Sequence, residues 1–342
     1  MKILFVAASF FPNIGGVEKH ILELSRVLMS EGNTVTVLTP LTADQKSLET
    51  IEGIAIKRFP KNRNKVATWR TMRQYSEDIS QADIIHAHDY IPFFWIYPLA
   101  KLKGKGVWVT FHGWEGRVPP ARSVILLRRL AEKLAAGSIC VGQFIKTWYG
   151  QHPDKIIYGG VHINASLPQI NQVLPLKKFI FLGRLDHDNG FDIFIEFFIL
   201  YYSCEPQAVL TIIGDGPLRN EAEKILKEGK VNYSFLGKVK DPAALISRSD
   251  VACLGGYLSI LEVMAAGVIP LAIYQNLLRK DYLHLTPFAK TMIIASSAEE
   301  LVNELKKITK EQISEIKKIN FGLCQKFTWK NVANEYLSLW HM

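Results

Sequence analysis

The sequence has 342 residues, of which 48% are hydrophobic and 21% are charged, and it contains no low-complexity tract. At about 100–200 residues per domain, this length predicts two folded domains, and the composition excludes a disordered chain and a fibrous repeat. The four cysteines lie far apart and form no CxxC pair. We therefore expect neither a disulfide framework nor a structural zinc site, and a reducing, cytoplasmic location.

The positive charge is concentrated in the first half of the chain. Residues 1–170 carry 21 Lys and Arg against 13 Asp and Glu, whereas the remainder carries 20 against 19. Such a basic half attracts acidic partners or an anionic membrane surface. Because no helix-turn-helix, zinc finger or RNP-like aromatic strand accompanies the charge, we do not expect the protein to bind nucleic acid.

The chain opens with a strand, a helix and a second strand. An apolar run over 3–8 predicts a buried strand, an amphipathic pattern from 17 to about 32 predicts a helix, and residues 34–38 predict the next strand. Further strand-like runs of the first half lie at 54–59, 84–87, 106–110 and 138–141. The helical stretches between them indicate a doubly wound, parallel sheet.

The same half is predicted to stay out of the bilayer interior. The amino-terminal apolar run is short and lacks a small-residue cleavage site, so we expect no secretory signal. The most apolar window, Ile91–Ala100, is interrupted by Pro92 and Pro98. It is also shorter than the ~20 residues of a spanning helix.

A second alternating domain begins with the strand-like run at 177–183. It continues with helices and strands at 191–202, 208–213, 218–228 and 233–236 and with a βα unit at 250–267. The pattern loosens around 165–176, where we place the boundary. The prediction is an α/β chain with Rossmann-like domains over 1–168 and 175–326 and a terminal helix over 327–342. The cleft between two such domains usually holds the ligand.

The loop before the first helix carries Gly15 and Gly16. Glycines at this place allow the backbone to approach an anion, while the free N–H groups and the dipole of the helix stabilise negative charge. The loop lacks the GxGxxG spacing of a nicotinamide site. The alternative interpretation is that the two glycines only turn the chain.

Histidines follow two of the predicted strands. His112 comes directly after the strand at 106–110, where a doubly wound sheet binds its ligands. It is either a functional residue or a buried structural histidine. His86 and His88 lack a third ligand at suitable spacing, so we expect no metal site.

The second domain has glycine-containing loops at the ends of its predicted strands, namely Gly183-Arg184-Leu185, Gly214-Asp215-Gly216-Pro217 and Leu254-Gly255-Gly256-Tyr257. With the amino terminus of the next helix they suit a nucleotide diphosphate. Glu262 would then accept hydrogen bonds from ribose hydroxyls. The alternative is a capping box, because Ser259 and Glu262 have the S-x-x-E spacing.

Together these motifs resemble glycosyltransferase family 4, of the GT-B fold, over essentially the whole chain. The resemblance rests on Gly15-Gly16-Val17-Glu18, His86-Ala87-His88-Asp89, Thr110-Phe111-His112-Gly113, Gly183-Arg184-Leu185, Gly214-Asp215-Gly216-Pro217 and Leu261–Gly267. It implies two Rossmann-like, doubly wound domains that face a central cleft. The segment from Phe327 to Trp340 looks like the family's terminal segment, which crosses back onto the amino-terminal domain.

The resemblance also implies a role for each matching residue. His112 would lie beside the donor sugar near the reacting carbon and Arg184 would bind the diphosphate, and both are expected to be catalytic. Gly16 would contact the donor phosphates or shape the acceptor site. Glu262, the second glutamate of the family's E-x7-E motif, would hold the ribose. The expected donor-binding residues are Gly16, Arg184, Asn189, Gly214, Gly216, Gly255, Gly256, Tyr257, Ser259 and Glu262.

Two positions depart from the family's pattern. The lysine that usually follows the arginine is Asn189 here, and the first glutamate of E-x7-E is Leu254. The lost lysine removes a cation that would stabilise the departing diphosphate. Tyr257 and Ser259 are candidates for the sugar contacts of the missing glutamate. The candidates to replace the lysine are Lys238, Lys240, Arg279 and Lys280.

The resulting expectation is a retaining, metal-independent hexosyltransferase without a cofactor. It would move a sugar from a nucleotide-diphosphate sugar to a hydroxyl of a glycan or lipid-linked glycan. By resemblance, the leaving phosphate assists a front-face attack, so no carboxylate nucleophile is required. The alternatives are a non-catalytic GT-B subunit, a sugar-nucleotide-binding protein and a GT-B epimerase.

Residues 93–133 predict contact with an anionic membrane. Val124, Leu127, Leu130 and Leu134 recur at helical spacing, and an aromatic run over 93–97 precedes them. The basic residues of the range are Lys101, Lys103, Lys105, Arg122, Arg128, Arg129 and Lys133. Each basic side chain near an anionic surface contributes ~1 kcal/mol. The alternative is that the apolar stripe is core and the basic face is solvated. We expect a cytoplasmic protein attached to the inner face of the cell membrane.

Overall fold

Two compact units are formed by the residues that the computed structural model describes, which are 1–13, 15–42, 45–61, 65–113, 115–163, 174–239 and 241–341. The first unit comprises Met1–Gly159 and Trp329–Met342, and the second comprises Gly160–Thr328. The carboxyl-terminal helix therefore belongs to the first unit. Most of the predicted boundary at 165–176 lies outside the described residues.

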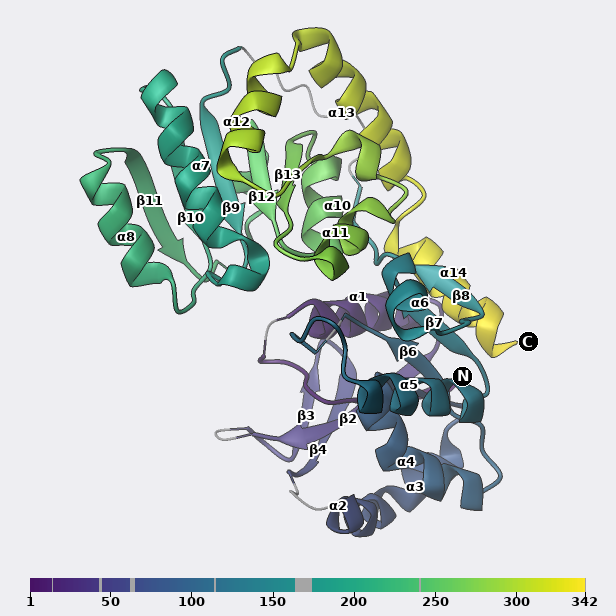
Figure 1. Ribbon diagram of the computed structural model, residues 1–342. Helices are drawn as coiled ribbons and strands as arrows, with labels where there is room; N and C mark the ends of the chain where they lie inside the picture. Colours follow the sequence, from purple (N-terminus) through teal and green to yellow (C-terminus); the bar gives the residue numbers. More distant parts are fainter. Residues whose placement is uncertain are drawn as a thin grey trace. The chain divides into compact units, whose positions relative to one another are not determined.

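The first unit is built on a mainly parallel sheet (Figure 1). Its strands are β1 (Lys2–Ala7), β2 (Thr34–Leu41), β3 (Leu48–Ile51), β4 (Ile54–Pro60), β5 (Ile84–His88), β6 (Trp108–Phe111), β7 (Ser138–Val141) and β8 (Lys155–Ile157). They lie in the order β3-β4-β2-β1-β5-β6-β7-β8. From β4 to β8 the neighbours are parallel. The predicted doubly wound sheet is confirmed.

Strand β3 is an addition that the sequence pattern does not predict. It forms an antiparallel hairpin with β4, in which Ile51 pairs with Ile54. Glu52 and Gly53 between them have φ values of 52° and 85°, as a two-residue type I′ turn requires. The run at 48–51 is too short for periodicity alone to distinguish a strand from a loop.

The helices of the first unit are α1 (Gly16–Ser30), α2 (Lys65–Met72), α3 (Ser76–Gln81), α4 (Tyr90–Leu102), α5 (Arg122–Leu134), α6 (Gln143–Tyr149) and α14 (Trp329–Trp340). Helix α4 contains the most apolar window of the sequence, and its side chains Phe93 and Ile96 are fully buried. Among the described residues, none of the helices combines the length and the apolar character needed to span a membrane.

The second unit contains a parallel sheet in the order β11-β10-β9-β12-β13-β14 (Figure 1). The strands are β9 (Lys178–Leu182), β10 (Val209–Ile213), β11 (Asn232–Gly237), β12 (Val251–Leu254), β13 (Ile269–Ile273) and β14 (Ile293–Ala295). The helices are α7 (Phe191–Cys204), α8 (Arg219–Glu228), α9 (Ala243–Ile246), α10 (Tyr257–Ala265), α11 (Leu277–His284), α12 (Ala298–Lys307) and α13 (Lys310–Cys324). This unit is also Rossmann-like, as predicted.

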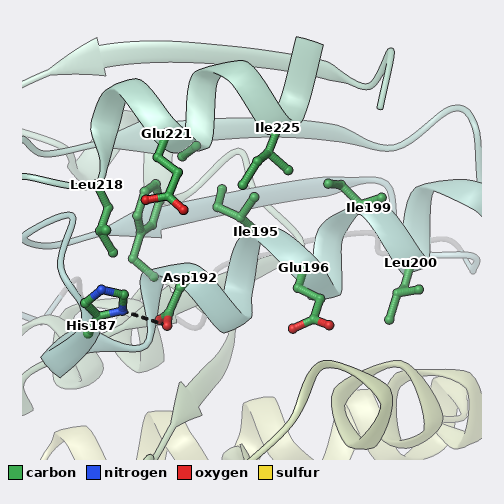
Figure 2. A pocket seen from close by; sticks show the side chains of 11 residues that line it. His187, Asp192, Ile195, Glu196, Ile199, Leu200, Leu218, Glu221 and Ile225 are labelled. Carbon is green, nitrogen blue, oxygen red and sulfur yellow. Dashed lines mark hydrogen bonds and ion pairs between the residues drawn. The ribbon is translucent and has the colours of Figure 1, made fainter. Parts of the chain in front are cut away.

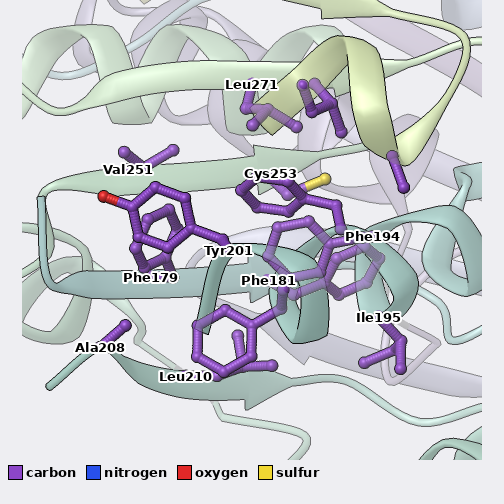
Figure 3. Close-up of a cluster of buried hydrophobic side chains, with 14 of the residues drawn as sticks. Phe179, Phe181, Phe194, Ile195, Tyr201, Ala208, Leu210, Val251, Cys253 and Leu271 are labelled. Atoms are coloured by element: carbon purple, nitrogen blue, oxygen red, sulfur yellow. The ribbon is translucent and has the colours of Figure 1, made fainter. Parts of the chain in front are cut away.

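An aromatic core anchors β9 in the second unit. Figure 3 shows Phe179 and Phe181 of β9 among Phe194 and Tyr201 of α7. The ring centroids of Phe179 and Tyr201 lie 4.9 Å apart, and those of Phe181 and Phe194 lie 5.4 Å apart. Alternate residues of a strand share a face, so both phenylalanines reach the helix. Each buried ring contributes about 1.5–3 kcal/mol, which fixes the strand and the start of the loop that follows it.

The strand order reverses once in the middle of each sheet. In the second unit this happens between β9 and β12, whose last residues Leu182 and Leu254 are paired. In the first unit it happens between β1 and β5, where Ala7 pairs with His88. Doubly wound folds bind ligands at the carboxyl ends of such strands. The residues predicted to be functional follow these strands or their direct neighbours.

Candidate active site

The loops after β9 and β12 lie side by side in the second unit, because the last residues of the two strands are paired. The first loop carries Arg184, and the second carries Gly255 and Gly256. Arg184 exposes 74% of its side chain, and its Nε lies 3.4 Å from Asp186 Oδ2. An ion pair with so exposed a cation restrains the guanidinium weakly, so Arg184 is available to an anionic ligand.

Asn189 connects these two loops. Its side-chain amide donates to the carbonyl oxygen of Arg184 at 3.2 Å and to Asp186 Oδ1 at 2.9 Å. A Cβ at Gly255 would lie 2.2 Å from Asn189 Oδ1. The residue at the family's lysine position is therefore close to Arg184, but its neutral amide supplies no positive charge.

Gly214 and Gly216 are explained by packing. A Cβ at Gly214 would lie 1.8 Å from the carbonyl oxygen of Gly183, and one at Gly216 would lie 2.5 Å from that of Leu185. The N–H of Leu185 also donates to the carbonyl of Asp215 at 3.1 Å. The two glycines let the loop after β10 lie backbone to backbone against the loop after β9. They shape the site whether or not they touch a phosphate.

Helix α10 begins at Tyr257, with Gly256 as its N-cap. Ser259 therefore lies inside the first turn, and its hydroxyl donates to the carbonyl of Gly256 at 2.8 Å. The capping-box interpretation is wrong, because a capping box needs the serine before the helix. Half-buried Glu262 lies in the second turn.

A side chain at Gly256, before the start of α10, would meet little. Apart from its two chain neighbours, the nearest described atom to a Cβ at Gly256 would be the hydroxyl oxygen of Tyr282, at 4.0 Å. Packing among the described residues therefore does not require a glycine there. An open helix amino terminus with little side chain around it suits an anion.

The side chain of Tyr257 is engaged inside the protein. Its ring stacks on that of Tyr282 at 4.0 Å, and its hydroxyl donates to the carbonyl of Tyr282 at 2.7 Å. The hydroxyl of Tyr282 in turn accepts the N–H of Tyr257 at 3.0 Å. Tyr257 thus supports the start of α10, and its hydroxyl is not available to replace the glutamate that is missing at Leu254.

The cations considered as substitutes for the missing lysine differ in placement. Arg279 is 3% exposed, and its guanidinium lies 4.7 Å from the centre of the Tyr282 ring. Lys280 Nζ lies 5.7 Å from the centre of the Tyr274 ring. Lys238 is exposed just after β11, and Lys240 lies outside the described residues. Arg184 is the cation carried by the β9 loop itself.

The histidines of the first unit form a buried cluster. Because alternate strand residues share a face, His86 and His88 of β5 lie on the same side as Thr110 and His112 at the end of β6. His88 Nδ1 lies 3.0 Å from His112 Nε2, and His86 Nε2 lies 2.7 Å from Thr110 Oγ1. His112 is 9% exposed and His88 1%. His112 is therefore the outermost member of the pair.

Helices α1 and α14 complete the cluster with side chains that are distant in sequence. His20 Nε2 lies 2.9 Å from the hydroxyl of Tyr336, which lies 2.8 Å from Thr110 Oγ1. The indole of Trp340 donates to His86 Nδ1 at 3.1 Å. Within the described residues, no group of three or more His, Cys, Asp or Glu is arranged to hold a metal ion. The imidazoles instead bond to one another and to α14.

Burial keeps these imidazoles neutral. It lowers the pKa of His20 and of His86 to about 3. It lowers the pKa of His88 and of His112 well below the usual value, and the neighbouring histidines add to this effect. A neutral imidazole offers one N–H donor and one acceptor nitrogen. His112 therefore exchanges hydrogen bonds at neutral pH without carrying a charge.

The loop that carries His112 is held by Arg128 of α5. Arg128 is 1% exposed, and its Nη2 donates to the carbonyls of His112 and Gly113 at 3.3 and 3.1 Å and to Glu115 Oε1 at 2.7 Å. The prediction that Arg128 belongs to a basic surface is wrong. Position 128 lies one turn before buried Ala131, on the covered face of the helix, where Glu115 compensates the charge.

Asp89 links the ends of β5 and β6. Its φ of 85° is uncommon for a residue other than glycine. Its Oδ1 accepts the N–H of Tyr90 at 2.8 Å, and its Oδ2 lies 3.4 Å from the N–H nitrogen of His112 and 3.6 Å from Arg128 Nη2. Burial raises the pKa of this carboxyl, while Arg128 opposes the effect. The backbone of His112 is thus positioned from two sides.

The two glycines before α1 differ in what surrounds them. A Cβ at Gly15 would lie 2.5 Å from Glu18 Oε2, whereas a Cβ at Gly16 would have no described atom within 4 Å apart from its chain neighbours and the backbone of its own helix. Packing among the described residues therefore gives no reason for a glycine at position 16. The open first residue of α1 suits close approach of a phosphate or hydroxyl.

A cavity of about 370 Å³ lies between α7 and α8 of the second unit (Figure 2). Its walls are mainly apolar and include Ile195, Ile199 and Ile225. His187 Nδ1 and Asp192 Oδ2 lie 2.8 Å apart at one end. None of the predicted donor-binding residues, all of which are described, lines it. The cavity and the glycine loops are therefore different places.

Two family models match the chain in succession. Residues 14–164 match the model "Glycosyltransferase Family 4", and residues 166–320 match "Glycosyl transferases group 1". The chain belongs to glycosyltransferase family 4. This finding confirms the resemblance seen in the motifs. As a family 4 member, the enzyme is a retaining glycosyltransferase that uses a nucleotide sugar.

Curated relatives and solved structures agree with this membership. The phosphatidyl-myo-inositol mannosyltransferase of Mycobacterium leprae is 27% identical over 340 residues, covering 88% of this chain and 87% of the relative. A Campylobacter jejuni alpha-1,4-N-acetyl-D-galactosaminyltransferase, whose name specifies a diNAcBac-PP-undecaprenol glycan, is 23% identical over 279 residues, covering 77% and 75%. The Anabaena HepE structure with UDP has a TM-score of 0.77 at 16% identity, covering 99% and 100%. That likeness shows the GT-B fold.

Proposed function

We propose that the enzyme transfers a hexose from its nucleotide-diphosphate sugar to a hydroxyl of a lipid-linked acceptor, or of a glycan carried on one. The M. leprae relative is named for phosphatidyl-myo-inositol and the C. jejuni relative for a polyprenol-linked glycan. Both align with this chain over more than three quarters of its length. A lipid-linked acceptor is the class that these two names have in common.

The placement of Arg184 and the start of α10 on adjacent loops carries the donor assignment. These loops follow paired strands at the point where the strand order reverses. The exposed guanidinium of Arg184 and the open helix start at Gly256 offer a cation and a helix dipole to the diphosphate. Glu262, in the same helix, accepts hydrogen bonds from the ribose hydroxyls.

The charge that develops on the departing diphosphate is stabilised by the same two features. With Asn189 at the lysine position, this site has one side-chain cation fewer than the family's pattern. The dipole of α10 therefore carries a larger share of the stabilisation. The leaving phosphate takes the proton of the attacking hydroxyl, so the reaction needs no carboxylate nucleophile. His112 contacts the donor sugar, and Gly16 leaves room at the start of α1.

Nucleotide release tests this function. A thermal-shift screen of UDP-sugars and GDP-sugars identifies the donor first, because a bound ligand raises the melting temperature by mass action. The enzyme is then incubated with that donor, with and without polyprenyl-diphosphate-linked glycans or phosphatidylinositol in detergent. We expect release of nucleotide diphosphate only when an acceptor is present. Binding without release under any condition would identify a non-catalytic subunit, and acceptor-independent conversion of the sugar would identify an epimerase.

We also propose that helices α4 and α5 attach the enzyme to an anionic membrane on its cytoplasmic face. Leu126 and Leu130 of α5 are 67% and 42% exposed, and Leu102 at the end of α4 is 84% exposed. The exposed basic residues here are Lys101 of α4, Lys103 directly after it, and Arg122, Arg129 and Lys133 of α5. Buried Arg128 and Phe93 do not take part. The predicted surface at 93–133 is therefore narrower than its sequence range.

Vesicle flotation tests this attachment. Phosphatidylglycerol vesicles at low ionic strength should carry the protein upward, and phosphatidylcholine vesicles should not, because the attraction depends on charge and is screened by salt. The double variant Leu126→Ser, Leu130→Ser should lose flotation and keep its melting temperature, since both side chains are exposed. Protein that stays entirely in the soluble fraction would reject the attachment.

A further inference from the structure

We propose that His88 is a positioning residue that fixes the proton of His112 on Nδ1, so that His112 meets the donor sugar as a hydrogen-bond donor. The sugar contact rests on the function proposed above. The proton assignment rests on hydrogen-bond geometry within the first unit, so the two parts can fail separately.

The short contact between the two rings requires one shared proton. His88 Nδ1 and His112 Nε2 lie 3.0 Å apart, a hydrogen-bonding distance. Both rings are neutral, and a neutral imidazole has one N–H and one lone pair. One ring must therefore donate and the other accept. If His88 donates, the proton of His112 lies on Nδ1, and if His112 donates, its proton lies on Nε2.

The far nitrogen of His88 decides between these two states. His88 Nε2 is buried and has no hydrogen-bond partner among the described residues. If His112 donated, the proton of His88 would lie on Nε2 and form a buried N–H without an acceptor. Orphaned buried N–H groups are rarer in proteins than unsatisfied acceptors. His88 therefore donates from Nδ1 and keeps only a lone pair on Nε2.

The surroundings of His88 hold its ring in this orientation. The edge of Phe5 lies against it with ring centroids 5.0 Å apart, and the ring of His86 lies at 5.3 Å. His86 is itself fixed, because the indole of Trp340 can only donate and does so to His86 Nδ1 at 3.1 Å. Asp89 and Arg128 contact the backbone of His112, whereas His88 contacts its ring.

The assigned proton gives His112 a defined chemical role. Its Nε2 lone pair is occupied by His88, and its Nδ1 carries a proton. The ring thus donates to a sugar oxygen and has no free lone pair with which to remove a proton. This role agrees with a mechanism in which the leaving phosphate takes the proton of the attacking hydroxyl. His88 itself touches no substrate in this scheme.

Imidazole NMR of protein labelled with ¹⁵N-histidine tests the proton assignment without any substrate. His112 signals are identified by their loss in His112→Gln. We expect the neutral Nδ1–H form of His112 in the unmodified protein and in His88→Asn, whose amide nitrogen replaces Nδ1 as donor. In His88→Leu the donor is absent, so the proton should move or become shared between the nitrogens. A proton on Nε2 of His112 in the unmodified protein overturns the proposal, and so does an unchanged form in His88→Leu.

Turnover with the donor found by thermal shift tests the sugar contact. His88→Leu should lower kcat about tenfold, the scale of one misplaced hydrogen bond, while His88→Asn stays within about threefold of the unmodified enzyme. Equal turnover in all three proteins, with the NMR result as expected, overturns the contact between His112 and the sugar. Melting curves establish that each variant is folded. If His88→Leu does not fold, two measurements decide: the comparison of His88→Asn with the unmodified enzyme, and the NMR form of the unmodified protein.

Discussion

The two units hold their candidate site residues by different means. In the first, buried neutral imidazoles bond to one another and to side chains of α1 and α14, with His112 outermost. In the second, glycines let loops lie backbone to backbone, and the side chain of Arg184, on one of these loops, is exposed. The first arrangement depends on where protons lie, and the second on how closely main chains approach. Each should therefore fail under a different perturbation.

The largest expected effect is acid destabilisation of the first unit. Burial lowers the pKa of its imidazoles, to about 3 for His20 and His86. Below the ordinary histidine pKa of 6.5, the unfolded chain therefore binds more protons than the folded protein. The stability is present above about pH 6.5 and is lost as pH falls toward the folded pKa. At 1.36 kcal/mol per pH unit, each of these two groups costs about 2 kcal/mol at pH 5. His88 and His112 add to this cost, and Asp89, whose pKa burial raises, offsets a part.

Tryptophan fluorescence during urea unfolding measures this effect selectively, because every one of the 7 tryptophans of the sequence falls within residues assigned to the first unit. The unfolding midpoint should drop steeply between pH 7 and 5. His20→Asn should reduce the proton uptake on unfolding by about one. A midpoint that stays constant over this pH range would contradict the neutral cluster.

The next largest effect should be steric and lie in the second unit. Gly214→Ala places a Cβ 1.8 Å from the carbonyl oxygen of Gly183, at a φ of 140°. The backbone must move, which costs about 3 kcal/mol or more. Circular dichroism during thermal unfolding should record the loss. The matched control is Gly16→Ala, whose Cβ meets no described atom within 4 Å apart from its chain neighbours and its own helix backbone, so its stability should change by less than about 0.5 kcal/mol. Equal stability of the two variants would refute the packing explanation.

Arg184→Ala separates function from packing in the second unit. Its side chain is 74% exposed, so the melting temperature should stay within a degree or two. Turnover should fall about 10²–10³-fold, the scale for losing one group that stabilises transition-state charge. Turnover equal to that of the unmodified enzyme would remove Arg184 from the site.

The smallest expected effect is that of Glu262→Gln on nucleotide affinity. In the proposed site the carboxylate accepts hydrogen bonds from the ribose hydroxyls. A hydrogen bond to a charged group contributes about 1–3 kcal/mol. Calorimetry with the nucleoside diphosphate of the donor measures the change. Unchanged affinity with a lower melting temperature would mean that Glu262 only supports α10.

Much of the secondary structure follows from the sequence because strands and helices carry different periods. The run at 138–141 matches β7, and the run at 177–183 and the helix predicted over 218–228 match β9 and α8 to within one residue at each end. Strand β3 could not be predicted from periodicity, because four residues hold too few repeats of either period. The family membership also follows from the sequence, because its motifs follow predicted strands at fixed places along the chain.

The site is less readable from the sequence than the fold. The sequence does not distinguish Gly16 from Gly214. In the structure, Gly16 has open space where a side chain would begin, whereas Gly214 lies against a backbone carbonyl. Arg128 and Arg129 are adjacent in one helix, yet the first is buried under the His112 loop. Residues such as Tyr336, which join the histidine cluster from α14, have no local signal.

Local periodicity and motif order therefore determined the element types, the doubly wound sheets and the family of this protein. Periodicity and motif order both depend on neighbours along the chain. The tertiary structure alone decided which glycines face packing atoms and which face open space, that the arginine at 128 is internal, and that the rings of His88 and His112 lie at hydrogen-bonding distance. Each of these depends on atoms brought together from distant parts of the sequence, where a difference of 1 Å separates a contact from a clash.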